Sequence, residues 1–175
     1  MTTGVILYGP PASGKDTITG ALHALDPSYQ LFPRLKAGPG RTTGYRMSTD
    51  AEITALRARG EIIWENHRYQ SIYVLDRPEL EKRLANHVPV LHLGQVEAIA
   101  AVRGVNLAAS WLVVSVWCPR EIAEQRIAAR ATGDTEARLR AWDETQPLAD
   151  ADLIIDTAQT DPQTAARTIH RAMTV

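Results

Sequence analysis

The chain has 175 residues, of which 45% are apolar and 22% charged, and its formal net charge is -1. This is the composition of an ordinary globular protein with enough apolar residues for a core, and its charge balance excludes a general attraction to nucleic acid or to a membrane surface. Cys118 is the single cysteine, which excludes an internal disulfide, and no apolar run could span a bilayer, so we expect a cytoplasmic protein without nucleic-acid or membrane partners.

The first half of the chain predicts strands that alternate with helices. A short apolar strand at residues 4–8 leads into a glycine-rich turn and a helix over 15–25. A second strand is predicted at 29–35, and a loop rich in glycine at 36–44. A capping signal at 48–52 starts a helix that reaches residue 59. Two short strands, 61–64 and 68–75, and a helix over 78–86 follow.

The second half continues the alternation. Strands are predicted at 88–93, 111–117 and 151–156, and helices at 95–103, 119–131, 135–144 and 161–172. Alternating strands and helices predict an α/β fold with a central parallel sheet flanked by helices. We expect one domain over residues 1–175, with an inserted lobe at 34–86 that has strands of its own and an arginine-bearing region at 126–140.

The turn after the first strand reads GPPASGKDT and matches the phosphate-binding pattern G-x-x-x-x-G-K-[ST] except in its last place. In this pattern backbone N–H groups and a helix N-terminus hold phosphates, and the lysine reaches the β- and γ-phosphates. The alternative is a plain glycine-rich turn between a strand and a helix. The pattern predicts that ATP binds to this turn through Gly9, Pro10, Ala12, Ser13, Gly14, Lys15, Asp16 and Thr17.

Asp16 stands where a hydroxyl residue normally contacts Mg²⁺. A carboxylate is a hard oxygen ligand that suits this ion, so we expect Asp16 to hold Mg²⁺ directly or through water. In the alternative interpretation Asp16 points away, and Thr17 or solvent completes the metal's ligands. A disabled site would more readily have lost Lys15, which is present.

Four arginines surround the break at residues 131–134: Arg126, Arg130, Arg138 and Arg140. Arginines on a mobile segment beside ATP would stabilise the charge on a transferring phosphoryl group. We therefore expect Arg126 to contact ATP, and Arg130 and Arg138 to be catalytic. The alternative is a solvated pair of helices in which nearby glutamates neutralise the arginines: Glu121, Glu124 and Glu136.

The inserted lobe has residues suited to an anionic acceptor. Four cationic residues flank its glycine-rich loop: Arg34, Lys36, Arg41 and Arg46. Downstream, the Glu65 carboxylate could accept hydrogen bonds from amines or hydroxyls, and Tyr69 and Tyr73 could donate to a phosphate. We expect Arg34, Arg41 and these three residues to bind the acceptor, with ordinary surface packing as the alternative.

Four segments in this order resemble guanylate kinase and its relatives: residues 9–17, 34–45, 60–73 and 119–140. The GKD form of the turn resembles the ribose 1,5-bisphosphate phosphokinase branch. The resemblance implies a P-loop NTPase fold with an acceptor-binding lobe and an arginine lid. It also implies acceptor phosphate near Arg34, Arg41 and Tyr73, acceptor recognition at Glu65, and adenine near residues 155–157.

The chain departs from this resemblance at the end of its third core strand. Guanylate kinases usually carry acidic residues where His92, Gly94 and Gln95 stand, and we expect Gln95 to contact the acceptor. The change argues against GMP and shifts metal binding toward Asp16. The sequence predicts an ATP- and Mg²⁺-dependent kinase for a nucleoside monophosphate or a ribose phosphate. The alternative is a non-catalytic guanylate kinase-like binding module, and the oligomeric state is left open.

Overall fold

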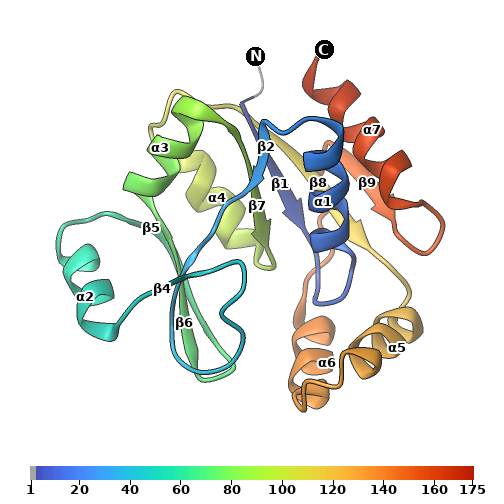
Figure 1. Cartoon of the computed structure of the whole chain (residues 1–175), viewed down its shortest axis with the longest axis horizontal. Coiled ribbons are helices and arrows are strands. Elements are labelled where there is room, and N and C mark those ends of the chain that lie inside the picture. Colours follow the sequence, from blue (N-terminus) through green and yellow to red (C-terminus); the bar gives the residue numbers. More distant parts are fainter. Residues whose placement is uncertain (1–2) are drawn as a thin grey trace.

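The computed structural model describes residues 3–175 and has a central sheet of five parallel strands (Figure 1). Their order across the sheet is β2-β7-β1-β8-β9. The strands are β1 (Gly4–Tyr8), β2 (Tyr29–Leu31), β7 (Val88–Leu93), β8 (Trp111–Trp117) and β9 (Leu153–Asp156). Every neighbouring pair is parallel, which confirms the predicted α/β fold with a central parallel sheet.

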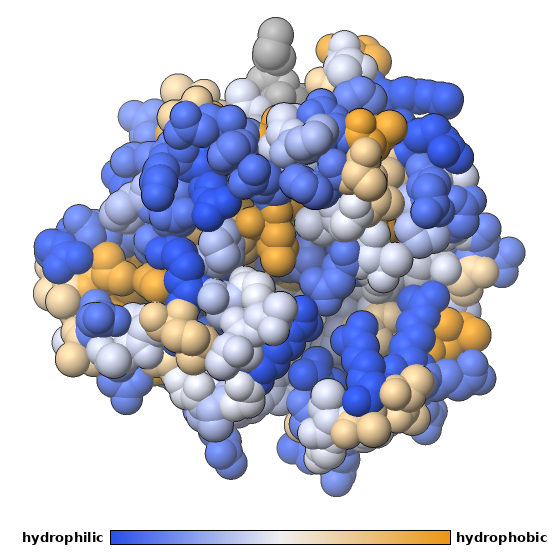
Figure 2. All heavy atoms as spheres, in the orientation of Figure 1, coloured by the Kyte–Doolittle hydropathy of each residue, from blue (hydrophilic) through white to orange (hydrophobic). Residues whose placement is uncertain are grey.

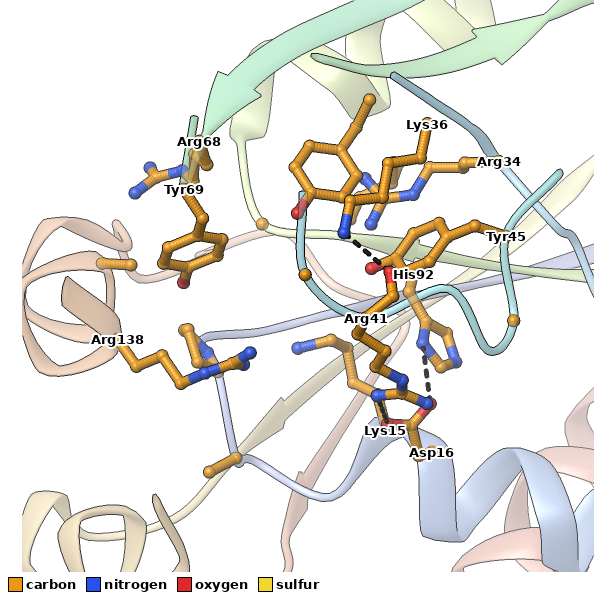
Figure 3. A pocket seen from close by; sticks show the side chains of 18 of the residues that line it. Lys15, Asp16, Arg34, Lys36, Arg41, Tyr45, Arg68, Tyr69, His92 and Arg138 are labelled. Carbon is orange, nitrogen blue, oxygen red and sulfur yellow. Dashed lines mark hydrogen bonds and ion pairs between the residues drawn. The ribbon is translucent and has the colours of Figure 1, made fainter. Parts of the chain in front are cut away.

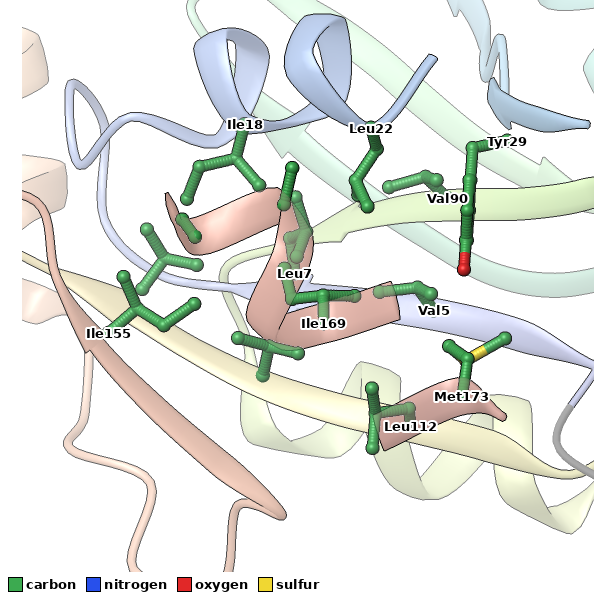
Figure 4. Packing of buried hydrophobic residues seen from close by; sticks show 14 residues of the cluster. Val5, Leu7, Ile18, Leu22, Tyr29, Val90, Leu112, Ile155, Ile169 and Met173 are labelled. Carbon is green, nitrogen blue, oxygen red and sulfur yellow. The ribbon is translucent and has the colours of Figure 1, made fainter. Parts of the chain in front are cut away.

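Helices cover both faces of this sheet, and side chains of β1 alternate between them. Val5 and Leu7 pack with α1 (Lys15–Leu25) and α7 (Pro162–Met173), as Figure 4 shows. Ile6 and Tyr8 pack on the other face with α3 (Arg77–Asn86) and α4 (Val96–Gly104). Because both faces are buried, β1 is apolar throughout, and it carries the following turn at a fixed place on the sheet edge.

A second sheet forms the core of the inserted lobe. Its strands run in the order β4-β3-β6-β5, and α2 (Asp50–Ala58) packs on it through Ile53. The strands are β3 (Leu35–Ala37), β4 (Arg46–Met47), β5 (Ile62–Arg68) and β6 (Ser71–Asp76). Leu80 of α3 packs instead with the cluster on the central sheet, which Leu75 of β6 also joins.

Several of the predicted strands were wrong in their bounds, and the strand expected at 61–64 is β5, which continues to Arg68. The strand expected at 29–35 is two strands in different sheets, β2 and β3, and Pro33 between them has no N–H to continue a ladder. The strand expected at 68–75 begins at Ser71, because Tyr69 and Gln70 form a two-residue turn with φ of 50° and 60°. Such a turn needs positive φ at both positions, which usually selects asparagine or glycine.

The helices that carry the arginines pack against the turn after β1. Ile127 of α5 (Arg120–Arg130) lies in a small cluster with Ala12 and Cys118, and Trp142 of α6 (Thr135–Glu144) packs beside them. The predicted capping box of α2 is confirmed between Thr49 and Glu52. Within residues 3–175, no helix is long and apolar enough to cross a membrane.

Leu22→Ala tests the packing that fixes α1 over the sheet. Leu22 is fully buried between α1, α7 and the strands, so its truncation should lower the free energy of unfolding by about 2–5 kcal/mol. Leu25→Ala on the same helix is the control, because Leu25 is 45% exposed and should change stability by about 0.5 kcal/mol or less. Urea unfolding measures both, and equal losses would contradict this packing.

Candidate functional site

A cavity of about 440 Å³ opens at the edge of the central sheet where β1 and β7 end. It lies between the lobe and the segment that joins α5 to α6, and the space-filling view is notched between these two parts (Figure 2). Two carboxylates line it, Asp16 and Asp134. Seven cationic side chains line it as well: Lys15, Arg34, Lys36, Arg41, Arg68, Arg130 and Arg138. This excess of positive charge suits a strongly anionic ligand.

The turn after β1 has the backbone of an anion cradle. Gly14 has φ of 106°, and a Cβ there would lie 3.0 Å from the Thr157 side chain. A Cβ at Gly9 would lie 2.0 Å from the Val116 carbonyl oxygen, so only glycine fits there. Gly14 is also the N-cap of α1 and provides no side-chain cap, which leaves the first N–H groups of this helix free to bind an anion.

Lys15 is a cation with neutral partners. Its Nζ donates to the carbonyl oxygens of Gly9 at 2.7 Å and Pro10 at 2.8 Å, and lies 3.4 Å from the Ser13 hydroxyl. No carboxylate of residues 3–175 forms an ion pair with it. Burial, opposed by the charge of Asp16, lowers the pKa of Lys15 to about 7. An anion bound in the turn would supply the missing negative charge.

Asp16 stands beside Lys15 and between two groups from other elements (Figure 3). Its Oδ2 lies 3.5 Å from Nη1 of Arg41, and its Oδ1 lies 3.7 Å from Nδ1 of His92. Burial opposes ionisation, but the cations beside it hold the pKa of Asp16 below its usual value. Burial and the charge of Lys15 lower the pKa of His92 to about 3, so its ring is neutral at physiological pH.

The lobe end of the cavity is a stack of cations and tyrosines (Figure 3). Tyr45 and Tyr73 lie 5.4 Å apart between ring centroids, and the Arg34 guanidinium lies 5.4 Å from the Tyr73 ring. Lys36 is only 2% exposed, and its Nζ lies 5.3 Å from the Tyr45 ring and donates to the Arg41 carbonyl at 2.7 Å. Fixed cations and phenol hydroxyls are suited to holding a phosphate.

The arginines after β8 divide into two groups. Arg130 and Arg138 line the cavity, and Arg138 lies 5.2 Å from the Tyr69 ring of the lobe. Arg140, in contrast, forms a solvent-exposed ion pair with Glu136. Arg126 does not line the cavity but donates to the Ala12 carbonyl at 3.1 Å and to the Thr157 hydroxyl at 2.9 Å. It therefore braces the turn from outside.

Glu65 does not line the cavity, contrary to its predicted place there. Its carboxylate accepts two hydrogen bonds from Arg57 of α2, at 2.9 and 3.0 Å. The pairing register of β5 shifts between Ile62 and Trp64, and alternation from this bulge turns Glu65 toward α2 and Asn66 toward the cavity. The side-chain oxygen of Asn66 is buried without a hydrogen-bond partner in the described part of the chain.

Most of the predicted site residues line this one cavity: Gly9, Ala12, Gly14, Lys15, Asp16, Thr17, Arg34, Arg41, Tyr69, Tyr73, Gln95, Arg130 and Arg138. Pro10 and Ser13 contact Lys15 from behind the turn. Arg46 lies away from the cavity in an ion pair with Asp76. Sequence reasoning assigned no role to several polar lining residues, among them Tyr45, Asn66, Arg68 and Asp134. Tyr45 and Asn66 lie within segments 34–45 and 60–73, which carried the resemblance, and this position is the signal that could have indicated them.

The donor set suits Mg²⁺ only as a partner of bound phosphates. Within residues 3–175, no cluster of three or more His, Cys, Asp or Glu residues could hold a metal ion alone. Mg²⁺ is usually bound by one or two carboxylates together with waters and substrate phosphates. Asp16 meets this requirement, because its side chain is 48% exposed and lines the cavity beside Lys15.

Comparisons with known proteins identify the fold. No family model matches the chain, and no curated protein matches it in sequence. Among solved structures, guanylate kinase from Anaplasma phagocytophilum is similar with a TM-score of 0.63 and 15% identity, over 99% of this chain and 85% of that one. A protein designated APE1195 has a TM-score of 0.57 and 17% identity, over 99% of this chain and 97% of that one.

Identities this low show a shared fold and nothing finer. The five-stranded parallel sheet and its flanking helices match over almost the whole chain. The resemblance that the motifs indicated is thereby confirmed at the level of structure: the chain has a guanylate kinase-like fold.

Proposed function

We propose that the protein is an ATP-dependent kinase that transfers the γ-phosphoryl group of ATP to a small phosphorylated acceptor. The observation that carries this proposal is the Lys15 ammonium, which is held by carbonyl groups in an anion cradle and lacks a carboxylate partner. A partly buried cation whose hydrogen-bond partners are all neutral is costly, so its presence supports an anionic ligand that completes it. The same observation disfavours a binding module that has lost catalysis.

The residues around the cradle would each have a separate role in phosphoryl transfer. The amides of the turn and Lys15 would hold the β- and γ-phosphates, and Arg130 and Arg138 would stabilise the charge on the transferring group. Asp16 would hold Mg²⁺, which when bound neutralises phosphate charge. The tyrosine and cation stack in the lobe would place the acceptor's phosphate. Closure of the lid over both ligands would exclude water.

The lining also bears on which acceptor is used. Both lining carboxylates lie outside the lobe, so within residues 3–175 the lobe offers no carboxylate to accept hydrogen bonds from the amine groups of a guanine. Asn66 and Gln95 are the neutral amides that remain for recognition. This supports a ribose phosphate over GMP as the acceptor, and other nucleoside monophosphates stay candidates.

The direct test is transfer of label from γ-labelled ATP in the presence of Mg²⁺. The acceptor panel should include GMP, other nucleoside monophosphates and ribose phosphates. The proposal expects label in at least one phosphorylated acceptor and none in unphosphorylated ribose. Absence of both transfer and ATP binding across the panel would refute it.

Lys15→Met should lower the rate of phosphoryl transfer and raise the free energy of unfolding. Phosphoryl transfer should fall by about 100-fold or more, because a donor to the transferring group is lost. Because the pKa of Lys15 is about 7 in the folded protein and 10.5 is its ordinary value, which applies to the unfolded chain, loss of its proton on folding costs free energy near neutral pH. The variant should be more stable at pH 7, and its advantage should shrink toward pH 10, by up to ~1.4 kcal/mol per pH unit.

Urea unfolding of both proteins from pH 7 to 10 measures this difference. Lys82→Met is the control, because the Lys82 side chain is 73% exposed and should show neither effect. A stability difference between Lys15→Met and the parent protein that does not change with pH would contradict the lowered pKa of Lys15.

Asp16→Ala should lower kcat by at least about tenfold while the affinity for ATP changes little, since metal ligands act mainly on the transferring group. Asp16→Ser should restore part of the activity, because a hydroxyl is the usual residue at this place. Steady-state kinetics over a range of Mg²⁺ concentrations measures both. Unchanged activity in Asp16→Ala would remove this residue from the mechanism.

Asn66→Ala and Glu65→Ala form a matched pair on opposite faces of β5. Asn66→Ala should raise KM for the acceptor about five- to tenfold, the value of one hydrogen bond, and leave KM for ATP unchanged. Glu65→Ala should leave both KM values nearly unchanged, because Glu65 contacts α2. The reverse pattern would show that the lobe faces its ligand with the other side of β5.

A further inference from the structure

Asp134 is a carboxylate in a cavity whose other charges are almost all positive. Among residues 3–175 that line the cavity, only Asp16 carries the same charge. The Asp134 side chain is 30% exposed, so its charge is partly shielded from water. A negative charge beside phosphates weakens their binding unless a cation offsets it. Asp134 therefore needs a role other than direct contact with an anionic ligand.

Both carboxylate oxygens of Asp134 accept a hydrogen bond. Nε of Arg138 donates to Oδ2 at 2.8 Å, and the Thr132 hydroxyl donates to Oδ1. Burial opposes ionisation, but these hydrogen bonds hold the pKa of Asp134 below its usual value. Thr132 thus fixes one side of the carboxylate, and the other side is directed at Arg138.

Asp134 does not cap the helix that it begins. It is the N-cap residue of α6, where an aspartate usually accepts a hydrogen bond from an N–H of the first turn, and its side chain forms no such bond. Asp161, the N-cap residue of α7, accepts from the Thr164 N–H at 2.9 Å in the usual way. Asp134 contacts Arg138 in place of a cap, so the stability of α6 alone does not account for its orientation.

The Arg138 guanidinium is held on two sides. Asp134 accepts its Nε–H, and its Cζ lies 5.2 Å from the centre of the Tyr69 ring (Figure 3). Its Nη1 and Nη2 donate no hydrogen bond to any of residues 3–175, and Arg138 lines the cavity. These two groups carry four of the five guanidinium donors. Anchoring through Nε therefore leaves them for an anionic ligand.

We propose that Asp134 is a positioning residue for Arg138: it fixes the guanidinium through Nε so that Nη1 and Nη2 face the phosphoryl group in transfer. This inference rests on the proposed kinase function. An arginine side chain loses rotamer freedom when it is fixed in one place. Since Asp134 and Tyr69 fix it before the reaction, this cost does not add to the barrier for transfer.

A double-mutant cycle tests whether Asp134 acts through Arg138. Asp134→Ala should lower kcat about tenfold and leave KM for ATP nearly unchanged, because a misplaced catalytic group slows the chemical step. In an Arg138→Ala background the same change should lower kcat by less than about twofold, because no guanidinium remains to be positioned. Asp134→Asn keeps an oxygen that can accept from Nε, so it should lose less activity than Asp134→Ala.

Glu136→Ala is the matched control for this cycle. Glu136 forms an ion pair with Arg140 at the same i, i+4 spacing on α6, but its side chain is 91% exposed and lies outside the cavity lining. Loss of this pair should leave kcat unchanged. An equal fall of kcat in Glu136→Ala and Asp134→Ala would show a general effect on α6 and refute the role of Asp134.

Nitrogen-15 NMR of the arginine side chains tests the anchor without any ligand. The signal missing from Arg138→Ala assigns the Nε–H of Arg138. In the unmodified protein this hydrogen should exchange with water more slowly than the Nε–H of Arg140, which is not part of the Arg140 ion pair. The protection should be lost in Asp134→Ala, and equal exchange in both proteins would overturn the inference.

The kinetic outcomes separate the two claims. Unchanged kcat in Asp134→Ala would refute the role of Asp134, while the activity of the unmodified protein upholds the kinase. A rise in kcat would show that the carboxylate withholds Arg138 from the ligand, and equal losses in both backgrounds would show an effect independent of Arg138. Either result refutes positioning. If the unmodified protein phosphorylates no acceptor, both claims fail. If Asp134→Ala does not fold, Asp134→Asn takes its place in the cycle, and its loss should likewise vanish in Arg138→Ala.

Discussion

The site depends on one partly buried cation. The Lys15 ammonium lies inside a turn whose backbone carbonyls accept its hydrogens, and the uncapped start of α1 adds further positive potential beside it. Neighbouring residues hold the turn in this conformation. Gly9 lets the turn pass the Val116 carbonyl, Gly14 supplies the left-handed residue before the helix, and Arg126 holds the turn from behind. The hydrophobic packing of α1 on the central sheet fixes the turn in place.

The other cationic side chains of the cavity come from two partly independent units, the lobe and the arginine-bearing helices. The lobe has its own hydrophobic core, and the arginine-bearing helices have another that includes Ala12 of the turn. Across the gap, Arg138 lies against Tyr69, and Arg68 lies 3.4 Å from Glu144. Cations crowded in this way repel one another until an anion separates them. A stable fold alone would not select such a lining, and it fits the proposed site for two phosphorylated ligands.

The first strand, the turn and α1 could be predicted from sequence because three local signals agree there: an apolar run, glycines at fixed spacing, and helix-forming residues up to Asp26-Pro27. The start of α2 was equally local, since Thr49 and Glu52 cap it reciprocally. In the same way, Lys15, Asp16 and the inward-facing Arg130 and Arg138 follow from a motif and its neighbourhood.

The facing of β5 could not be predicted. In a regular strand that begins at Ile62, Glu65 would face the cavity and Asn66 would face α2. The bulge between Ile62 and Trp64 reverses this alternation, so Asn66 faces the cavity and Glu65 faces α2. The turn at Tyr69 and Gln70 contains no glycine or asparagine, which are the residues that usually indicate such a turn. The contacts of His92 with Thr19 and Asp16 likewise join residues more than 70 positions apart in the chain. Such tertiary contacts leave no local pattern in the sequence.

The measurement that tests the central claim most directly is amide NMR of the protein during titration with ATP and Mg²⁺. If the turn is a triphosphate cradle, the largest shifts should fall on the amides of Gly14, Lys15, Asp16 and Thr17. Adenosine without phosphates should leave these four signals unchanged. Shifts confined to other parts of the chain, or equal shifts with adenosine, would contradict the account.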